Sequence, residues 1–100
     1  LVGRMAQQAS SMVTQSVDAF VRRDVYLARS VAGQDDLVDE DFTAVKQALI
    51  AAIAREPGQG EVALDLLMIA KYFERIGDHA VNIAEWVEFS VTGEHKSDSM

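Results

Sequence analysis

The chain has 100 residues, enough for one domain with a single modest hydrophobic core. Its 49% apolar and 25% charged residues are ordinary for a globular protein and exclude a disordered chain. With 16 acidic against 9 basic side chains, the formal charge of −7 argues against nucleic-acid binding and favours cationic partners, including metal ions.

The residue content also limits the chemistry and the compartment. No cysteine is present, which excludes disulfides, thiolate metal sites and cysteine nucleophiles, and a protein without disulfides fits the cytoplasm. We expect no membrane insertion, because no run reaches the ~18 apolar residues of a membrane span and no signal peptide is visible. The chain opens with Leu1 rather than methionine, and we expect it to be a piece of a longer protein.

The first predicted helix ends near residue 23. Its apolar residues recur at helical spacing: Met5, Ala9, Met12, Val13, Val17 and Phe20. Arg22 and Arg23 fall in the last turn, where cations suit the helix dipole. Asp24 is then the type of residue that caps the start of the next helix.

The second predicted helix carries a stripe with alternating steps of three and four residues. Every position is apolar except Asp35: Ala28, Val31, Asp35, Val38, Phe42, Val45, Leu49 and Ala52. The stretch "AGQDD" around Gly33 can also be read as a helix end followed by a new cap. We favour one continuous helix, because the stripe keeps its phase across the gap. Pro57, in "REPGQG", marks the loop that follows.

The third predicted helix has the most regular stripe, with steps of four and three throughout: Val62, Leu66, Ile69, Phe73, Ile76, Ala80, Ile83 and Val87. Gly93 is expected to cap its end. No alternation of period two is long enough for a strand. The sequence therefore predicts an all-α fold, an antiparallel three-helix bundle with long second and third helices. We expect its core to contain Phe42, Leu49, Leu66, Phe73 and Ile83.

Two pairs of acidic residues accompany these stripes. In "FERIGDH", Glu74 and Asp78 are four residues apart, so they lie on one face of a helix and repel each other. Asp35 and Asp39 repeat the spacing, and Asp35 stands on the apolar stripe, where a carboxylate is costly unless paired or bound to a cation. Bundle packing could bring the two pairs together into one metal site. Oxygen-only ligands suit hard cations such as magnesium, calcium, manganese or ferric iron.

Other interpretations of the acids remain open. Acid pairs at this spacing are common on solvated helix faces. Arg29, Lys71 or Arg75 could also satisfy them as ion pairs. Gly77 lies close to the stripe of the third helix, and its missing side chain would let a neighbouring helix approach closely.

The remaining side chains do not assemble an enzyme. No nucleophile stands beside a base, and His79 and His95 lie far apart without a carboxylate framework. The loop "PGQG" lacks the lysine and the strand–loop–helix context of a phosphate-binding loop. Tyr72, Trp86 and Phe89 lie near one flank of the third helix, where they form a docking face for a protein or close the core against the first helix.

Two stretches of the sequence resemble a known family. "YFERIGDHAVNIAEWVEFSVTGEH" closely resembles the C-terminal repeat of the PhoU family, and "RDVYLARSVAGQDDLVDEDF" is similar to that family's second-helix pattern. The resemblance covers nearly the whole chain. It implies that residues 1–100 form one PhoU-like bundle, the C-terminal half of a tandem pair. The family's metal motif, Glu/Asp-x-x-x-Asp, falls on Asp35 with Asp39 and on Glu74 with Asp78.

The resemblance also implies a function. It implies an ion of iron, zinc, manganese or magnesium at that motif. It further implies a negative regulator of the phosphate-starvation response, which links the ATPase subunit of a phosphate ABC transporter to a membrane sensor histidine kinase and is not an enzyme. We therefore expect a cytoplasmic, metal-binding adaptor that forms a homodimer. The alternative is a structural helical interaction module with neither metal nor signalling role.

Overall fold

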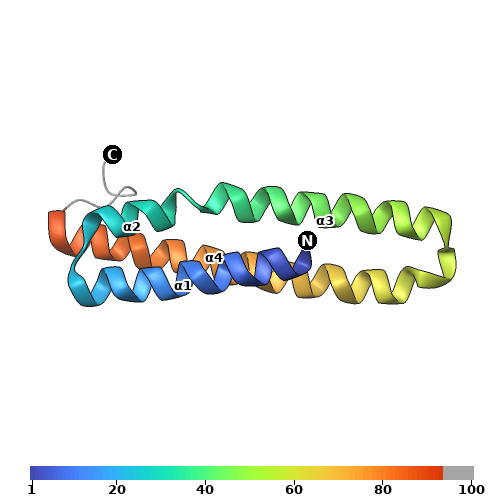
Figure 1. Ribbon diagram of the computed structural model, residues 1–100, viewed down its shortest axis with the longest axis horizontal. Helices are drawn as coiled ribbons and strands as arrows, with labels where there is room; N and C mark the ends of the chain where they lie inside the picture. Colours follow the sequence, from blue (N-terminus) through green and yellow to red (C-terminus); the bar gives the residue numbers. More distant parts are fainter. Residues whose placement is uncertain (94–100) are drawn as a thin grey trace.

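Helices account for almost all of residues 1–93, the part of the chain that the computed structural model describes. They are α1 (Val2–Arg22), α2 (Val25–Ala32), α3 (Asp35–Arg55) and α4 (Gly60–Thr92), with a 3₁₀ turn at Pro57–Gln59. Helices α2 and α3 follow each other along one arm, and α1 and α4 run beside that arm (Figure 1). The expected all-α three-helix bundle is thus confirmed. His95 lies outside the described residues.

The second arm is broken at Gly33 and Gln34, so our prediction of one continuous helix was wrong. The backbone N–H of Gln34 donates to the carbonyl of Val31 at 3.0 Å, which ends α2 in a tight turn, and α3 begins at Asp35. The stripe nevertheless keeps its phase, because Val31 and Val38 on either side of the break are both fully buried.

Side chains from α1 hold this break in place. Gln8 Nε2 donates to Gln34 Oε1 at 2.6 Å, and Gln34 Nε2 donates to Gln15 Oε1 at 3.0 Å. Gln8 and Gln15 are seven residues apart, so they stand two turns apart on the same flank of α1. The start of α3, and with it Asp35, is therefore tied to α1.

The expected helix boundaries at Asp24 and Gly93 are confirmed. Asp24 precedes α2, and its Oδ1 accepts a hydrogen bond from the backbone N–H of Leu27 at 3.0 Å. Gly93 has a φ of 78°, the left-handed conformation that glycine adopts without strain, and its N–H donates to the carbonyl of Phe89 at 2.7 Å.

Small residues of α4 form much of the core. Ala63, Ala70, Gly77 and Ala84 recur every seven residues along α4 and are all buried. Against them lie the buried residues of the other helices: Met5, Ala9, Met12, Ser16 and Ala19 from α1, and Ala28, Val31, Val38 and Val45 from α2 and α3. Small residues at these positions allow helices to approach one another closely.

The stripe predicted to be the seam of α4 lies mostly beside the core. Five of its residues are between 37% and 55% exposed, and we call them the outer stripe: Val62, Leu66, Ile69, Ile76 and Ile83. Ala80 and Val87 of the same predicted stripe are buried, as expected. Leu66 and Ile83 are thus not core residues, and Phe42, Leu49 and Phe73 are only partly buried against the core. The prediction failed because α4 carries two adjacent apolar stripes, and the one with smaller residues faces the neighbouring helices.

An apolar groove runs between α1 and α4. It is lined by Val17, Phe20, Asn82, Ile83 and Trp86. Trp86 is 56% exposed and Tyr72 is 57% exposed, so these two aromatic residues do not close the core against α1. None of the described helices combines the length and the apolar character needed to cross a membrane.

Candidate metal centre

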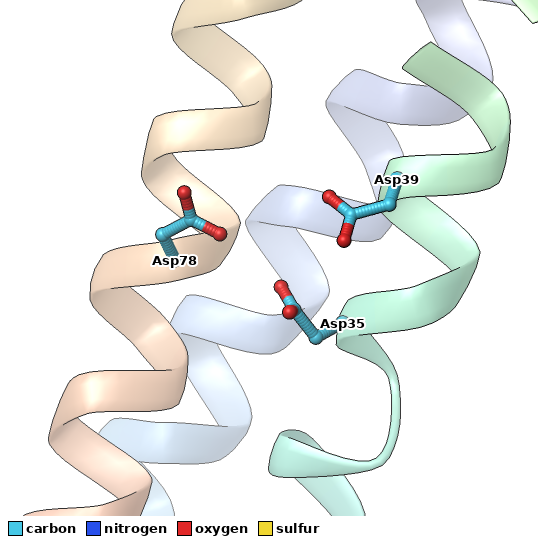
Figure 2. Close-up of side chains that lie close together, drawn as sticks. All are labelled: Asp35, Asp39 and Asp78. Atoms are coloured by element: carbon cyan, nitrogen blue, oxygen red, sulfur yellow. The ribbon is translucent and has the colours of Figure 1, made fainter. Parts of the chain in front are cut away.

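The two acid pairs meet where α3 and α4 run side by side. Asp35 and Asp39 stand one turn apart at the start of α3, and Asp78 stands on α4. Figure 2 shows the three carboxylates pointing into the space between these helices. One oxygen atom from each lies within 4.8 Å of the other two. The predicted convergence of the acids of α3 and α4 is therefore present in the fold.

Three pairs of side chains from α3 and α4 follow one another along these helices. We call this series of pairs the acid ladder and each pair a rung. Asp35 interacts with Asp78 in the first rung, and Asp39 interacts with Glu74 in the second. Phe42 and Lys71 form the third, where the Lys71 Nζ atom lies 5.2 Å from the centre of the Phe42 ring. All four predicted acids thus lie in the ladder, although Glu74 is not one of the three whose oxygens converge.

Arg29, Lys71 and Arg75 were the three candidates for ion pairs with these acids, and only Lys71 forms one, with Glu74. Its Nζ donates to Glu74 Oε1 at 2.6 Å. Arg29 instead pairs with Glu88 at 3.1 Å, and Arg75 lies over the ring of Tyr72. Among residues 1–93, no ion pair joins a cation to Asp35, Asp39 or Asp78.

Burial and mutual repulsion make it unfavourable for the three converging aspartates to be ionised together without a counterion. Burial raises the pKa of Asp35, and the charge of Asp78 and a hydrogen bond with it raise that pKa further. Burial, followed by the charge of Asp35 and a hydrogen bond with Glu74, raises the pKa of Asp39 to about 6. Asp35 Oδ1 is buried and has no hydrogen-bond partner among the described residues. An orphaned, buried carboxylate oxygen is costly, and a bound cation would satisfy it.

The glycine beside the ladder has a packing partner on each side. A Cβ atom at Gly77 would lie 3.6 Å from both methyl carbons of Val38 and 3.8 Å from the sulfur of Met12. These are ordinary van der Waals distances, so the neighbouring helices leave room for a methyl group and their approach does not depend on the missing side chain of Gly77. The exposed residues Asp36 and His79 stand outside the converging set.

Two supporting contacts were missed in the sequence. One is the pair of hydrogen bonds that Gln8 and Gln15 of α1 form with Gln34. The seven-residue spacing of these two glutamines, which places them on one flank of α1, could have indicated it. The other is the position of Lys71 over Phe42, which no spacing along one helix could reveal.

Comparison with known proteins identifies the family of this chain. A family model described as "PhoU domain" matches residues 2–87. The chain belongs to the PhoU family. All four acids of the ladder lie inside the matched range.

Several relatives carry the name phosphate-specific transport system accessory protein PhoU homolog. The one from Caulobacter vibrioides is 36% identical over 93% of this chain, and the one from Zymomonas mobilis is 39% identical over 89%. The one from Pseudomonas aeruginosa is 37% identical over 92% of this chain. The chain spans only 38% to 40% of the length of these three PhoU proteins.

Proposed function

We propose that this chain is part of a metal-binding adaptor that regulates phosphate uptake and restrains the phosphate-starvation response. The names of its relatives support the link to phosphate transport. In this proposal the chain regulates transport and catalyses no reaction. The observation that carries the metal-binding part is the convergence of one carboxylate oxygen each from Asp35, Asp39 and Asp78. It is supported by the buried Oδ1 of Asp35, which has no hydrogen-bond partner among the described residues.

The residues present fit a hard cation. Asp35, Asp39 and Asp78 would hold the ion, and Glu74 lies beside Asp39 in the second rung. Their donors are all carboxylate oxygens, which suit magnesium, manganese and ferric iron better than zinc, an ion that more often takes nitrogen and sulfur ligands. When bound, the ion supplies positive charge that offsets the repulsion between the carboxylates and links α3 to α4.

The proposed partners are the ATPase subunit of a phosphate ABC transporter and a sensor histidine kinase. The adaptor works in the cytoplasm as a homodimer. The formal charge of −7 disfavours nucleic acid as a partner. The exposed Tyr72 is the kind of aromatic side chain that protein interfaces favour.

We also propose that the chain forms the C-terminal half of a protein with two such bundles. The chain spans about two-fifths of the length of its relatives, which leaves room for a second bundle. The outer stripe of α4 and the groove beside Trp86 expose apolar residues along most of one helix, and monomeric proteins rarely leave such an extended apolar surface uncovered. In this proposal the second bundle packs there.

Manganese-dependent stabilisation tests the metal-binding part. An ion that binds only the folded state stabilises it by about 2.7 kcal/mol at a hundred times its dissociation constant. We expect wild-type protein to melt at a higher temperature in MnCl2. In Asp78→Asn this increase should disappear, while the melting temperature without metal stays the same or rises because one repelling charge is gone. Asp65→Asn, an exposed acid elsewhere on α4, is the matched control and should keep the full increase.

Two outcomes would refute the metal centre. One is a wild-type protein whose melting temperature does not respond to manganese. The other is an Asp78→Asn variant that responds as fully as Asp65→Asn. Either result would favour the alternative of a structural helical module whose acids form a solvated face.

The adaptor part requires a separate measurement. Binding of the protein to the purified ATPase subunit of its own phosphate transporter is to be measured with manganese and with EDTA. We expect binding that weakens in EDTA and in Asp78→Asn. No detectable binding under either condition would count against the adaptor, whatever the metal measurement shows.

A further inference from the structure

Lys71 closes one end of the acid ladder. Its ammonium group donates to Glu74 at 2.6 Å and lies 5.2 Å from the centre of the Phe42 ring, so it contacts both helices that form the ladder. The Glu74 side chain is only 13% exposed, whereas that of Lys71 is 51% exposed. An ordinary surface ion pair contributes little, but here the acidic partner is mostly buried and stands beside another carboxylate, Asp39.

We propose that Lys71 is a built-in counterion that determines which ionic charge the centre accepts. The proposal rests on the metal centre described above. When ionised, the four carboxylates of the ladder carry −4, and Lys71 reduces this to −3. It also occupies Glu74, which leaves the three converging aspartates as the ligands available to an ion. Lys71 is thus a specificity-determining residue that favours one divalent ion over ions of higher charge.

The physical basis is the dependence of Coulomb energy on the charge of the ion. The repulsion between Lys71 and a bound ion is proportional to the ion's charge, so it is half as large again for a trivalent ion as for a divalent one. Removing the ammonium group also releases Glu74 to take part in binding. A substitution at Lys71 should therefore strengthen metal binding, and it should strengthen the binding of trivalent ions most. Loss of a merely structural contact would not do this.

Lys71→Met tests the proposal, because methionine keeps an unbranched apolar side chain beside Phe42 but removes the ammonium group, with its charge and its hydrogen bond to Glu74. Dissociation constants of Mn²⁺ and Tb³⁺ are to be measured by titration calorimetry at low salt. We expect binding to tighten roughly tenfold for Mn²⁺ and roughly thirtyfold for Tb³⁺, a ratio of three to two on a logarithmic scale. Without metal, Lys71→Met should melt at a lower temperature than wild type, because Glu74 loses its partner.

Two control variants accompany it. Arg75→Met removes the same charge one residue after Glu74, but the Arg75 guanidinium lies over the ring of Tyr72, 5.9 Å from its centre, rather than on the ladder. We expect it to change either affinity by less than about threefold. Lys71→Arg keeps the charge and should retain affinities close to those of wild type.

The outcomes separate this proposal from the metal centre itself. Wild-type protein that binds neither ion would overturn both. Wild-type protein that binds Mn²⁺, together with a Lys71→Met variant of equal or weaker affinity, would overturn the role of Lys71 alone. An equal gain in Arg75→Met would also overturn it, since the effect would then be one of net charge.

Discussion

Gly77→Ala should stabilise the protein, even though this glycine is buried in the motif "FERIGDH". A methyl group at Gly77 would meet Val38 at 3.6 Å and Met12 at 3.8 Å, which are ordinary van der Waals distances. Alanine is favoured over glycine inside a helix by about 1 kcal/mol, and burial of one methyl group adds up to about 0.8 kcal/mol. We therefore expect a gain of about 1–2 kcal/mol, or roughly 4–8 °C in melting temperature for each kcal/mol.

Urea unfolding of metal-free protein, followed by circular dichroism, measures this change. Gly77→Leu is the matched control, because its additional carbons would extend into Val38 and Met12 and should cost about 1–3 kcal/mol through overpacking. Both variants should unfold with the same dependence on urea as wild type. If Gly77→Ala loses 1 kcal/mol or more, the helices approach more closely than the distances above, and the packing described around α4 is incorrect.

Three further predictions concern the core, the ladder and the break between α2 and α3. Met12→Ala should cost about 2–5 kcal/mol in urea unfolding and should cost more than Phe73→Ala, because Met12 is fully buried and Phe73 is only partly buried. Because Asp39 has a pKa of about 6 in the folded protein and about 3.9 when unfolded, the folded state binds more protons between these values. The stability of metal-free protein should therefore fall as pH rises from 4 to 7. We expect a fall of about 1 kcal/mol, because solvent screens the charge of this exposed side chain. Asp39→Asn should flatten the dependence of melting temperature on pH. Gln34→Ala removes its side-chain hydrogen bonds to α1 and should cost about 1–2 kcal/mol in the same unfolding assay, against less than about 0.5 kcal/mol for the exposed Gln47→Ala.

The helical period predicted part of the core and misplaced the rest. On α2 and α3 there is one apolar stripe, and its members Val31, Val38 and Val45 are buried as expected. On α4 the regular stripe of large residues attracted the prediction, whereas Ala63 and Ala70 on the adjacent stripe occupy the core. Periodicity identifies apolar faces but does not rank two of them, because the choice depends on how closely the neighbouring helices approach.

The candidate site followed from spacing because its geometry is local within each helix. Residues four apart share a helical face, so each acid pair could be predicted without knowing the fold. The alignment of Asp35 with Asp78 and of Asp39 with Glu74 depends on how two antiparallel helices are aligned. That alignment comes from tertiary packing, as does the contact of Lys71 with Phe42, and neither can be derived from a pattern in one segment.

Anomalous diffraction from crystals soaked in manganese tests the central claim, that α3 and α4 build a metal centre, most directly. We expect an anomalous peak between α3 and α4, within bonding distance of the carboxylates of Asp35, Asp39 and Asp78, and its absence from crystals of Asp78→Asn. Peaks found only on exposed acids such as Asp36 and Glu40, or no peak at saturating manganese, would contradict the claim.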